Sequence, residues 1–218
     1  MKTLLFTSAC LLGLSTAAQA FDLQITEIWP GNEPGENLTS DWFEVTNVGT
    51  TAYDASADGF LFFDDDSQDF TTADIISGVA TIAPGESVIF IDDSDTAEFE
   101  TVWANVVLPQ LGTYNGSGLS QGGDGVTLFL APITGPTALI DIIDFEIFPD
   151  AGSNGGQSYD VSLGAFSTVG NASGALASAL SNDIGQFAVA SVGPAVPEPS
   201  AVALAALATC GLFARRRG

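Results

Sequence analysis

Three observations predict an all-β fold built as an antiparallel β-sandwich. Short runs alternate apolar with polar residues and are rich in Val, Ile, Phe and Thr, which is typical of half-buried strands. Turn-forming stretches such as Pro30-Gly31-Asn32 and Ala83-Pro84-Gly85 separate these runs. The runs do not alternate with long helical patterns, as parallel βαβ units would. Frequent turns between short strands therefore favour two packed antiparallel sheets.

The strand candidates begin with Leu23–Thr26, where apolar and polar residues alternate. In the next run, a period of two puts Trp42 and Glu44 on one face of the strand and Phe43 on the other. Asn47 stands before Val48-Gly49, where its short polar side chain favours a turn. The strands predicted up to residue 145 are Leu23–Thr26, Trp42–Val48, Gly59–Phe63, Ser87–Asp92, Val126–Ala131 and Ile140–Phe145.

One short helix is predicted over Asp95–Trp103. Asp95 and Glu98 have the spacing of a capping box. Phe99 and Trp103 are four residues apart, so they lie on one face of that helix.

After about Asp150 the chain becomes rich in Gly, Ser and Ala. Gln157–Val161 and Gln186–Val192 are candidates for late edge strands. Thr168–Asp183 is predicted to be a loop.

The charge of the chain is strongly one-sided. The sequence has 27 Asp and Glu, four Lys and Arg, no His and a formal net charge of −23. Every basic residue lies near an end, at Lys2 and Arg215–Arg217, and Glu198 is the one acid outside residues 21–195. A body without positive charge cannot neutralise phosphates, so nucleic acid is excluded as a partner. Salt or bound cations have to reduce its self-repulsion.

The composition also excludes most classes of catalytic site. Residues 21–195 contain no His, Lys, Arg or Cys, because the two cysteines are Cys10 and Cys210. Ser-His-Asp and Cys-His nucleophiles, Schiff-base lysines and zinc held by His or Cys are therefore absent. A two-carboxylate glycosidase stays open in principle, but no pair of acids stands out. We therefore expect a protein that is not an enzyme.

The first 20 residues have the order of a secretory signal peptide. Lys2 is followed by an apolar run around Leu4–Leu14 and then by small residues at Ala18 and Ala20. Cleavage is expected after Ala20, and the signal predicts export. Lipid attachment at Cys10 is the alternative, although Thr7 stands where a lipoprotein motif has Leu.

A second targeting pattern lies at the other end. Ser200–Ala214 is an uncharged, mostly apolar stretch, about 22 Å long as a helix at about 1.5 Å per residue. That is short for a hydrocarbon core of about 30 Å. Arg215, Arg216 and Arg217 follow and favour the cytoplasmic face. Before the stretch stands the motif Val196-Pro197-Glu198-Pro199, whose prolines favour an extended backbone.

Together the motif, the apolar stretch and the arginine cluster resemble the PEP-CTERM sorting signal of certain bacteria. The resemblance covers Val196–Gly218. It implies a membrane-embedded exosortase as partner, transient anchoring in the inner membrane through the short helix, and removal of the tail. It also implies a final location in the cell envelope or extracellular matrix. A plain tail anchor that contains the same motif is the alternative.

The domain itself carries several short blocks in a fixed order. These are Ile25–Ile28, Asp41–Asn47 with Val48-Gly49, Ile82–Ser87, the pair Phe99 and Trp103, Gly118–Ser120, and Gly123–Leu128. In this order they resemble a bacterial lamin-tail domain, and Asp41–Asn47 is the most specific block. The resemblance implies an immunoglobulin-like β-sandwich over residues 21–161, followed by a Gly/Ser/Ala-rich segment over 162–195 and the sorting signal over 196–218. The chain departs from the family in its lack of basic residues and in the acidic stretch Asp64–Asp69.

Two acidic stretches in predicted loops are candidate Ca²⁺ ligands, because clustered carboxylates are the hard oxygen donors that Ca²⁺ prefers. Neither stretch is an EF-hand, since Gln68 and Asp69 occupy positions that need a ligand and a glycine. A solvated acidic surface is the alternative. The candidate ligands are Asp64, Asp66, Asp69, Asp92, Asp93 and Asp95.

Asp41 and Glu44 are a further candidate pair, if they lie at a loop edge and bind a ligand. The structural interpretation of the same block places Trp42 in the core, with an indole N–H that needs a partner.

These observations lead us to expect an exported, non-catalytic protein with a structural or adhesive role at the cell surface. The alternative is a Ca²⁺-dependent binding module for extracellular polysaccharide or a surface protein.

Overall fold

The computed structural model describes residues 21–31, 38–92, 96–132, 139, 141–171 and 174–193. The predicted signal peptide with Ala18 and Ala20 lies outside these residues, as does the sorting segment with Val196–Pro199 and Arg215–Arg217. The described chain is mostly β-strand, which confirms the predicted all-β class. Within the described residues, no helix has the length and apolar character needed to span a membrane.

The larger sheet has six strands in the order β12-β11-β1-β2-β7-β8. The first strand of the chain, β1, lies inside this sheet between β2 and β11. β7 has the bounds predicted from the sequence. The strands of this sheet are β1 (Leu23–Trp29), β2 (Trp42–Asn47), β7 (Ser87–Asp92), β8 (Gln110–Tyr114), β11 (Tyr159–Asp160) and β12 (Ala165–Phe166).

The expectation of purely antiparallel pairing was wrong for one pair of strands. β8 runs parallel to β7, with Val88 opposite Gln110 and Asp92 opposite Tyr114. Helix α2 (Thr96–Val102) connects the two strands, and a parallel pair needs such a crossover. The helix itself confirms the prediction over Asp95–Trp103 for its described part.

The second sheet has four strands in the order β10-β9-β4-β5, all antiparallel. β9 and β10 form the longest pair, with a register shift between Ile142 and Asp144. The strands are β4 (Phe60–Asp64), β5 (Asp74–Ile75), β9 (Gly123–Ala131) and β10 (Asp141–Pro149).

A shared apolar core joins the inner faces of these two sheets. Phe43 of β2 stacks on Phe63 of β4 with ring centroids 5.4 Å apart, and Tyr114 of β8 lies 4.3 Å from Phe63. Six aromatic rings lie among aliphatic side chains in this core, because the strands of both sheets direct alternate apolar residues inward. The buried members are Leu23, Ile25, Ile28, Phe43, Val45, Tyr53, Leu61, Phe63, Ile82, Val88, Phe90, Tyr114, Leu119, Val126, Leu128, Leu130 and Phe148.

The two sheets also touch along both sides. Ser77 and Thr113 exchange backbone hydrogen bonds of 2.8 and 2.9 Å, which joins the chain after β5 to β8. On the other side the amide of Ile25 in β1 donates 2.7 Å to the Asp144 carboxylate in β10. These links fix the two sheets relative to each other.

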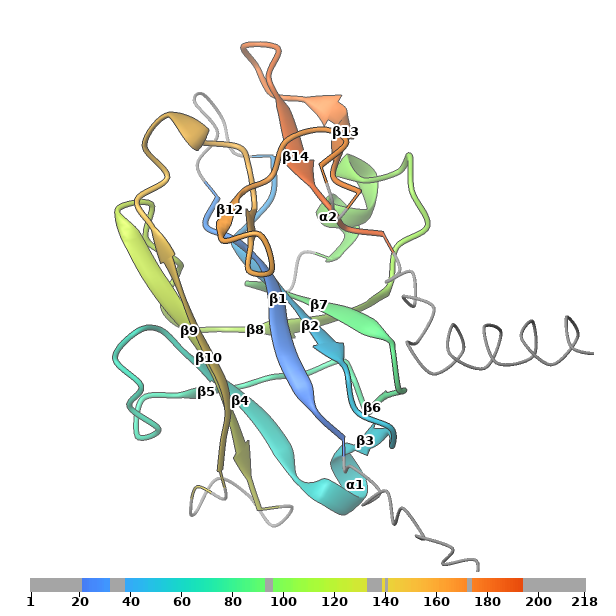
Figure 1. The fold of residues 1–218 in the computed structure, drawn as a ribbon, viewed down its shortest axis with the longest axis vertical. Helices are drawn as coiled ribbons and strands as arrows, with labels where there is room; N and C mark the ends of the chain where they lie inside the picture. The colour runs from blue at the N-terminus through green and yellow to red at the C-terminus, as the bar shows by residue number, and fades with distance from the viewer. Residues whose placement is uncertain are drawn as a thin grey trace, which may run out of the picture.

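The outer face of the six-stranded sheet is covered by α2 and by a hairpin of β13 (Leu176–Ser181) and β14 (Phe187–Ala190). Figure 1 shows α2 and this hairpin side by side at one end of the molecule. The prediction of a loop over Thr168–Asp183 was wrong for residues 176–181, because the hairpin places Ala188 and Ala190 against the sheet. A second core forms here from Trp29, Trp42, Ile89, Ile91, Phe99, Val102, Trp103, Ala188, Ala190 and Val192.

The remaining elements are short. β3 (Tyr53–Asp54) pairs with β6 (Thr81–Ile82), and a single turn, α1 (Ala55–Asp58), follows β3. A 3₁₀ turn, η1, covers Gly152–Asn154. α1 ends at Gly59, which has a φ of 125°. A β-carbon at this position would stand 2.2 Å from the carbonyl oxygen of Ala131, so the end of the helix requires glycine.

Candidate functional site

Three carboxylates form a row across the outer face of the six-stranded sheet. In the strand register, Glu27 of β1 stands opposite Glu44 of β2 on one side and Asp160 of β11 on the other. All three are buried, with 1%, 7% and 2% of the residue exposed. Because Glu27 and Glu44 are two residues from Trp29 and Trp42, they share the face of the second core. We call Glu27, Glu44 and Asp160 the carboxylate row.

Glu27 is the centre of the row. Its Oε1 accepts hydrogen bonds from the Ser158 hydroxyl, from the Ser191 amide at 2.9 Å and from the Ser167 hydroxyl at 3.5 Å. Its Oε2 is buried without a hydrogen-bond partner among the described residues. Burial raises the pKa of Glu27, although the bonds from Ser158 and Ser191 oppose the rise. The negative charge of Asp160 adds to it.

Glu44 is held between β1 and β7. Its Oε1 accepts a hydrogen bond of 2.6 Å from the Thr26 hydroxyl. Burial raises the pKa of Glu44 to about 8, and the neighbouring Glu27 contributes to the rise. The hydroxyls of Thr26 and Ser87 act in the opposite direction. Glu44 therefore keeps its proton at neutral pH.

Asp160 ends the row at the short strand β11. It accepts hydrogen bonds from the Ser162 hydroxyl at 2.7 Å and from the Leu163 amide at 3.0 Å. No residue from 21 to 193 is Lys, Arg or His, so no basic side chain of the described chain balances these acids. Burial without a cationic partner favours the protonated form of Glu27 and Glu44. The chemistry that this site offers is proton uptake and release.

The structure separates the candidate pair Asp41 and Glu44. Glu44 lies within β2 and belongs to the carboxylate row, whereas Asp41 precedes the strand and accepts a hydrogen bond of 2.6 Å from the Leu119 amide. Trp42 is fully buried as predicted and stacks on Trp29 at 5.8 Å, but its indole N–H finds no partner among the described residues. The block is thus part of the packing, and Glu44 is not at a loop edge.

Asn47 shapes the turn after β2, as the sequence predicted, and its side chain also bonds to other segments. Its side-chain oxygen accepts from the Gly49 amide at 3.0 Å and from the Asp22 amide at 3.1 Å. Its amide group donates 2.9 Å to the carbonyls of Thr51 and Ile82. One buried side chain therefore closes the turn and connects it to β1 and β6.

The acidic loop after β4 uses its carboxylates for its own hydrogen bonds. Asp64 is buried and accepts from the Ser67 hydroxyl at 2.6 Å and from the Asp69 amide at 2.7 Å. Asp69 in turn accepts from the Thr71 side chain and amide, which lowers the pKa of Asp69. Asp66 is exposed. Asp64 thus organises the loop, and Asp66 and Asp69 face solvent around it.

The second predicted acidic stretch is only partly described. Asp92 ends β7, and its amide donates 2.8 Å to the carbonyl of Asp41. Asp93 and Asp95 lie outside the described residues. Within the part of the chain that the structure describes, no three His, Cys, Asp or Glu side chains gather closely enough to hold a metal ion.

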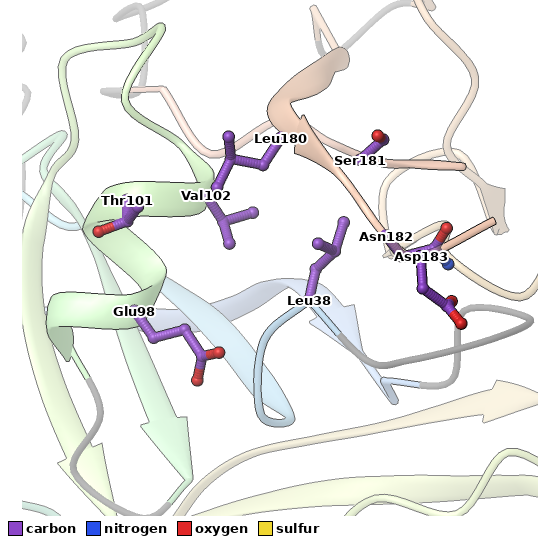
Figure 2. Close-up of a pocket in the computed structure, with 8 residues that line it drawn as sticks. All are labelled: Leu38, Glu98, Thr101, Val102, Leu180, Ser181, Asn182 and Asp183. Carbon is purple, nitrogen blue, oxygen red and sulfur yellow. The ribbon is translucent and has the colours of Figure 1, made fainter. Parts of the chain in front are cut away.

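A groove of about 360 Å³ lies between α2 and the β13–β14 hairpin. Figure 2 shows Leu38, Val102 and Leu180 gathered in its middle, and Glu98 and Asp183 on opposite sides. Thr101, Ser181 and Asn182 complete its lining. The groove has a small apolar floor and polar sides. It lies in the layer that covers the outer face of the six-stranded sheet, and that face carries the carboxylate row.

Sequence reasoning singled out Glu44, but with Asp41 as its partner, and missed the carboxylate row. In the sequence, Glu27 and Glu44 stand inside blocks that indicate the fold, and Asp160 stands inside a predicted late edge strand. The available signal was an acid inside an otherwise apolar strand, as in Ile25–Trp29, which becomes a buried acid once both faces of the sheet are covered.

Comparison of the chain with protein-family profiles, with curated proteins and with solved structures finds no match.

Proposed function

We propose that the chain is an exported, non-catalytic protein with a structural or adhesive role in the envelope or extracellular matrix of a bacterium. The proposal includes an immunoglobulin-like sandwich related to lamin-tail domains, and sorting by an exosortase through Val196–Pro199. The observation that carries it is the placement of positive charge. All four basic residues lie in the two predicted targeting segments, and three of them directly follow the short apolar stretch.

The described body supports a structural role. Its two larger sheets share an apolar core, and a third layer covers the outer face of the six-stranded sheet. The two buried acids with raised pKa, Glu27 and Glu44, are only 1% and 7% exposed, so a polymeric substrate does not reach them. The exposed surface carries acids and neutral polar groups, which suit contacts with hydrated polysaccharide or with cations.

The experiment that tests sorting uses the full chain, expressed in a bacterium that has an exosortase. Antibodies against the body follow its size and its distribution among cytoplasm, inner membrane, envelope and medium. We expect a shortened form in the envelope or medium. Replacing Pro197, Glu198 and Pro199 by Ala should leave a longer form in the inner membrane, because the motif that presents the tail is lost.

Pro194→Ala is the matched control, because it removes a proline just outside the motif. It should be processed like the native chain. Equal processing of the triple variant, or retention of the native chain in the cytoplasm, would contradict the proposal. Binding of the released form to matrix polysaccharide, with no change in the length of that polysaccharide, tests the adhesive role separately from catalysis.

A further inference from the structure

The last described part of the chain is tied to the first strand through one carboxylate. The Ser191 amide donates 2.9 Å to Glu27 Oε1 across a separation of 164 residues. The Ser158 hydroxyl donates to the same oxygen, and the Ser158 amide donates 3.0 Å to the Val189 carbonyl. The Val189 amide donates 2.9 Å to the Gly156 carbonyl. Glu27, residues 156–158 and the end of the hairpin thus form one hydrogen-bonded junction.

The apolar contacts of the hairpin are small by comparison. Ala188, Ala190 and the following Val192 are its fully buried contribution to the second core, and Leu176 packs against that core while partly buried. Ile184 and Phe187 are 57% and 49% exposed, so these two larger side chains contribute little to docking. Burial of alanine methyl groups stabilises much less than burial of a Leu or Phe side chain. The junction at Glu27 is therefore a large part of what holds the hairpin to the sheet.

We propose that Glu27 is a proton-operated latch for the β13–β14 hairpin. With the carboxyl group protonated, the hairpin stays docked over Trp29 and Trp42. When the proton is lost, the hairpin detaches while the core between the two sheets stays folded.

The geometry around Glu27 explains why a charge there opposes docking. The three donors to Oε1 favour the anion, but Oε2 is buried with no donor among the described residues. A buried oxygen without a partner is tolerated far better in a neutral group than in an anion. The titratable groups that face Glu27 are Glu44 on β2 and Asp160 on β11, and both are acids. The covering segments contribute the Ser158 and Ser167 hydroxyls and the Ser191 amide.

The direction of the pH effect follows from burial. Docking raises the pKa of Glu27 above its ordinary value of 4.5, because burial disfavours the charged form. In the detached state the carboxyl group reaches water and returns to that ordinary value. Docking is therefore strongest below about pH 4.5 and weakens as the pH rises through the pKa of the docked state.

The latch has a consequence for the tail that rests on the proposed function. Val196, the start of the proposed sorting motif, follows Ser191 by five residues. Detachment of the hairpin would free residues 174–193 as an extra spacer between the folded body and the motif. Protonation of Glu27 would then set how far the motif stands from the body.

Hydrogen exchange of the full chain in mild detergent, followed by mass spectrometry from pH 5 to pH 9, tests the latch. Rates are corrected for the intrinsic pH dependence of amide exchange. We expect protection of residues 174–193 to fall about tenfold per pH unit while only the docked state holds the extra proton. Protection in β2 and β9 should stay constant.

Two variants sharpen the test. Glu27→Gln keeps an acceptor oxygen but cannot release a proton, so its hairpin should stay protected across the whole pH range. Glu100→Gln removes one negative charge from the exposed face of α2 and should show the native pH dependence.

Three results would overturn the latch. The hairpin of the native chain could keep constant protection from pH 5 to pH 9, the Glu27→Gln chain could still lose it, or β2 and β9 could lose protection together with the hairpin. The pH series on the native chain decides the matter even if Glu27→Gln does not fold. Localisation is measured separately, so failure of the latch and failure of the sorting proposal are distinguishable.

Discussion

The two faces of the six-stranded sheet are both buried, but different side chains fill them. On the inner face, Phe43 packs against Phe63, Phe90 and Tyr114 with ring centroids 5.3 to 5.5 Å apart. These contacts join two sheets whose strands are fixed by continuous hydrogen bonding. The buried cluster on the inner face consists of aliphatic and aromatic side chains.

On the outer face, Trp29 stacks on Trp42 beside the buried carboxyl groups of Glu27 and Glu44. The indole N–H groups of Trp29, Trp42 and Trp103 have no hydrogen-bond partner among the described residues. The cover is one short helix and one hairpin with small apolar side chains. The same strands therefore support a core that is insensitive to pH on one side and a layer that depends on protonation on the other.

The largest effect that we expect is the pH dependence caused by Glu44. The folded state keeps this proton up to about pH 8, whereas the unfolded chain releases it near its ordinary pKa of 4.5. This one proton should therefore contribute a fall of about 1.4 kcal/mol per pH unit in the free energy of unfolding between these values, and its contribution should level off above them. Urea denaturation at pH 5, 6, 7 and 8 measures this slope.

Glu44→Gln should reduce that slope by the contribution of one proton, and Glu100→Gln should leave it unchanged. An identical slope in the native chain and in Glu44→Gln would show that Glu44 does not hold a proton in the folded state, and the contrast between the two faces would lose its main support.

A substitution in the core on the inner face should cause a large loss of stability that does not depend on pH. Phe43→Ala removes a fully buried ring from the centre of the aromatic core, so the free energy of unfolding should fall by about 3–5 kcal/mol. Urea denaturation at pH 5 and pH 8 should give the same loss. The half-exposed Phe187 provides the control, because Phe187→Ala should cost far less. A loss from Phe43→Ala that differs strongly between the two pH values would mean that the faces are coupled.

The side chain of Asn47 holds the turn after β2, next to the inner core. Asn47→Ala removes four hydrogen bonds and leaves the buried carbonyl of Ile82 and the carbonyl of Thr51 without this donor. The expected loss in the free energy of unfolding is about 2–3 kcal/mol. Asn115→Ala replaces an exposed asparagine and should be nearly neutral. A neutral Asn47→Ala would show that the turn forms without this side chain.

Substitutions in the acidic loop after β4 should change the free energy of unfolding least. Asp64→Ala removes the acceptor of the Ser67 hydroxyl and of the Asp69 amide, at a cost of about 1–2 kcal/mol in the free energy of unfolding. Asp66→Ala should change little because Asp66 is exposed. Equal losses in the two variants would contradict the organising role of Asp64.

Thermal melting distinguishes screening of the loop's negative charges by salt from binding of a cation at a specific site. Because Asp64 and Asp69 already accept several hydrogen bonds, we expect millimolar CaCl₂ and NaCl at matched ionic strength to raise the melting temperature equally. A saturable extra rise with Ca²⁺ that Asp66→Ala removes would instead favour the Ca²⁺-dependent binding module.

Local patterns were enough to predict the strands whose environment is regular. Ser87–Asp92 was predicted with the bounds of β7, and Trp42–Val48 with nearly those of β2. Both are runs of β-branched and aromatic residues followed or preceded by turn residues. The helix α2 was found because Phe99 and Trp103 have helical spacing, and their rings lie 6.3 Å apart in the structure.

Features that depend on distant partners were not predictable in the same way. β8 is a short run interrupted by Gly112, and its parallel pairing with β7 follows from the position of α2. β13 has a small-residue sequence that forms a strand because its hairpin partner packs on the second core. The carboxylate row needs three strands from separate parts of the chain, so no local pattern contains it.

The interior position of β1 also sets an order of events during folding. β1 can pair with β2 as soon as both are made, but its other neighbours arrive late, since Asp144 and Ser191 are 119 and 164 residues away from their partners in β1. Chains with many such distant contacts fold slowly, because long loops must close before the contacts form. Until β11 arrives, one edge of β1 is open to pairing with other chains. The six-stranded sheet is therefore completed only when nearly the whole body has been synthesised.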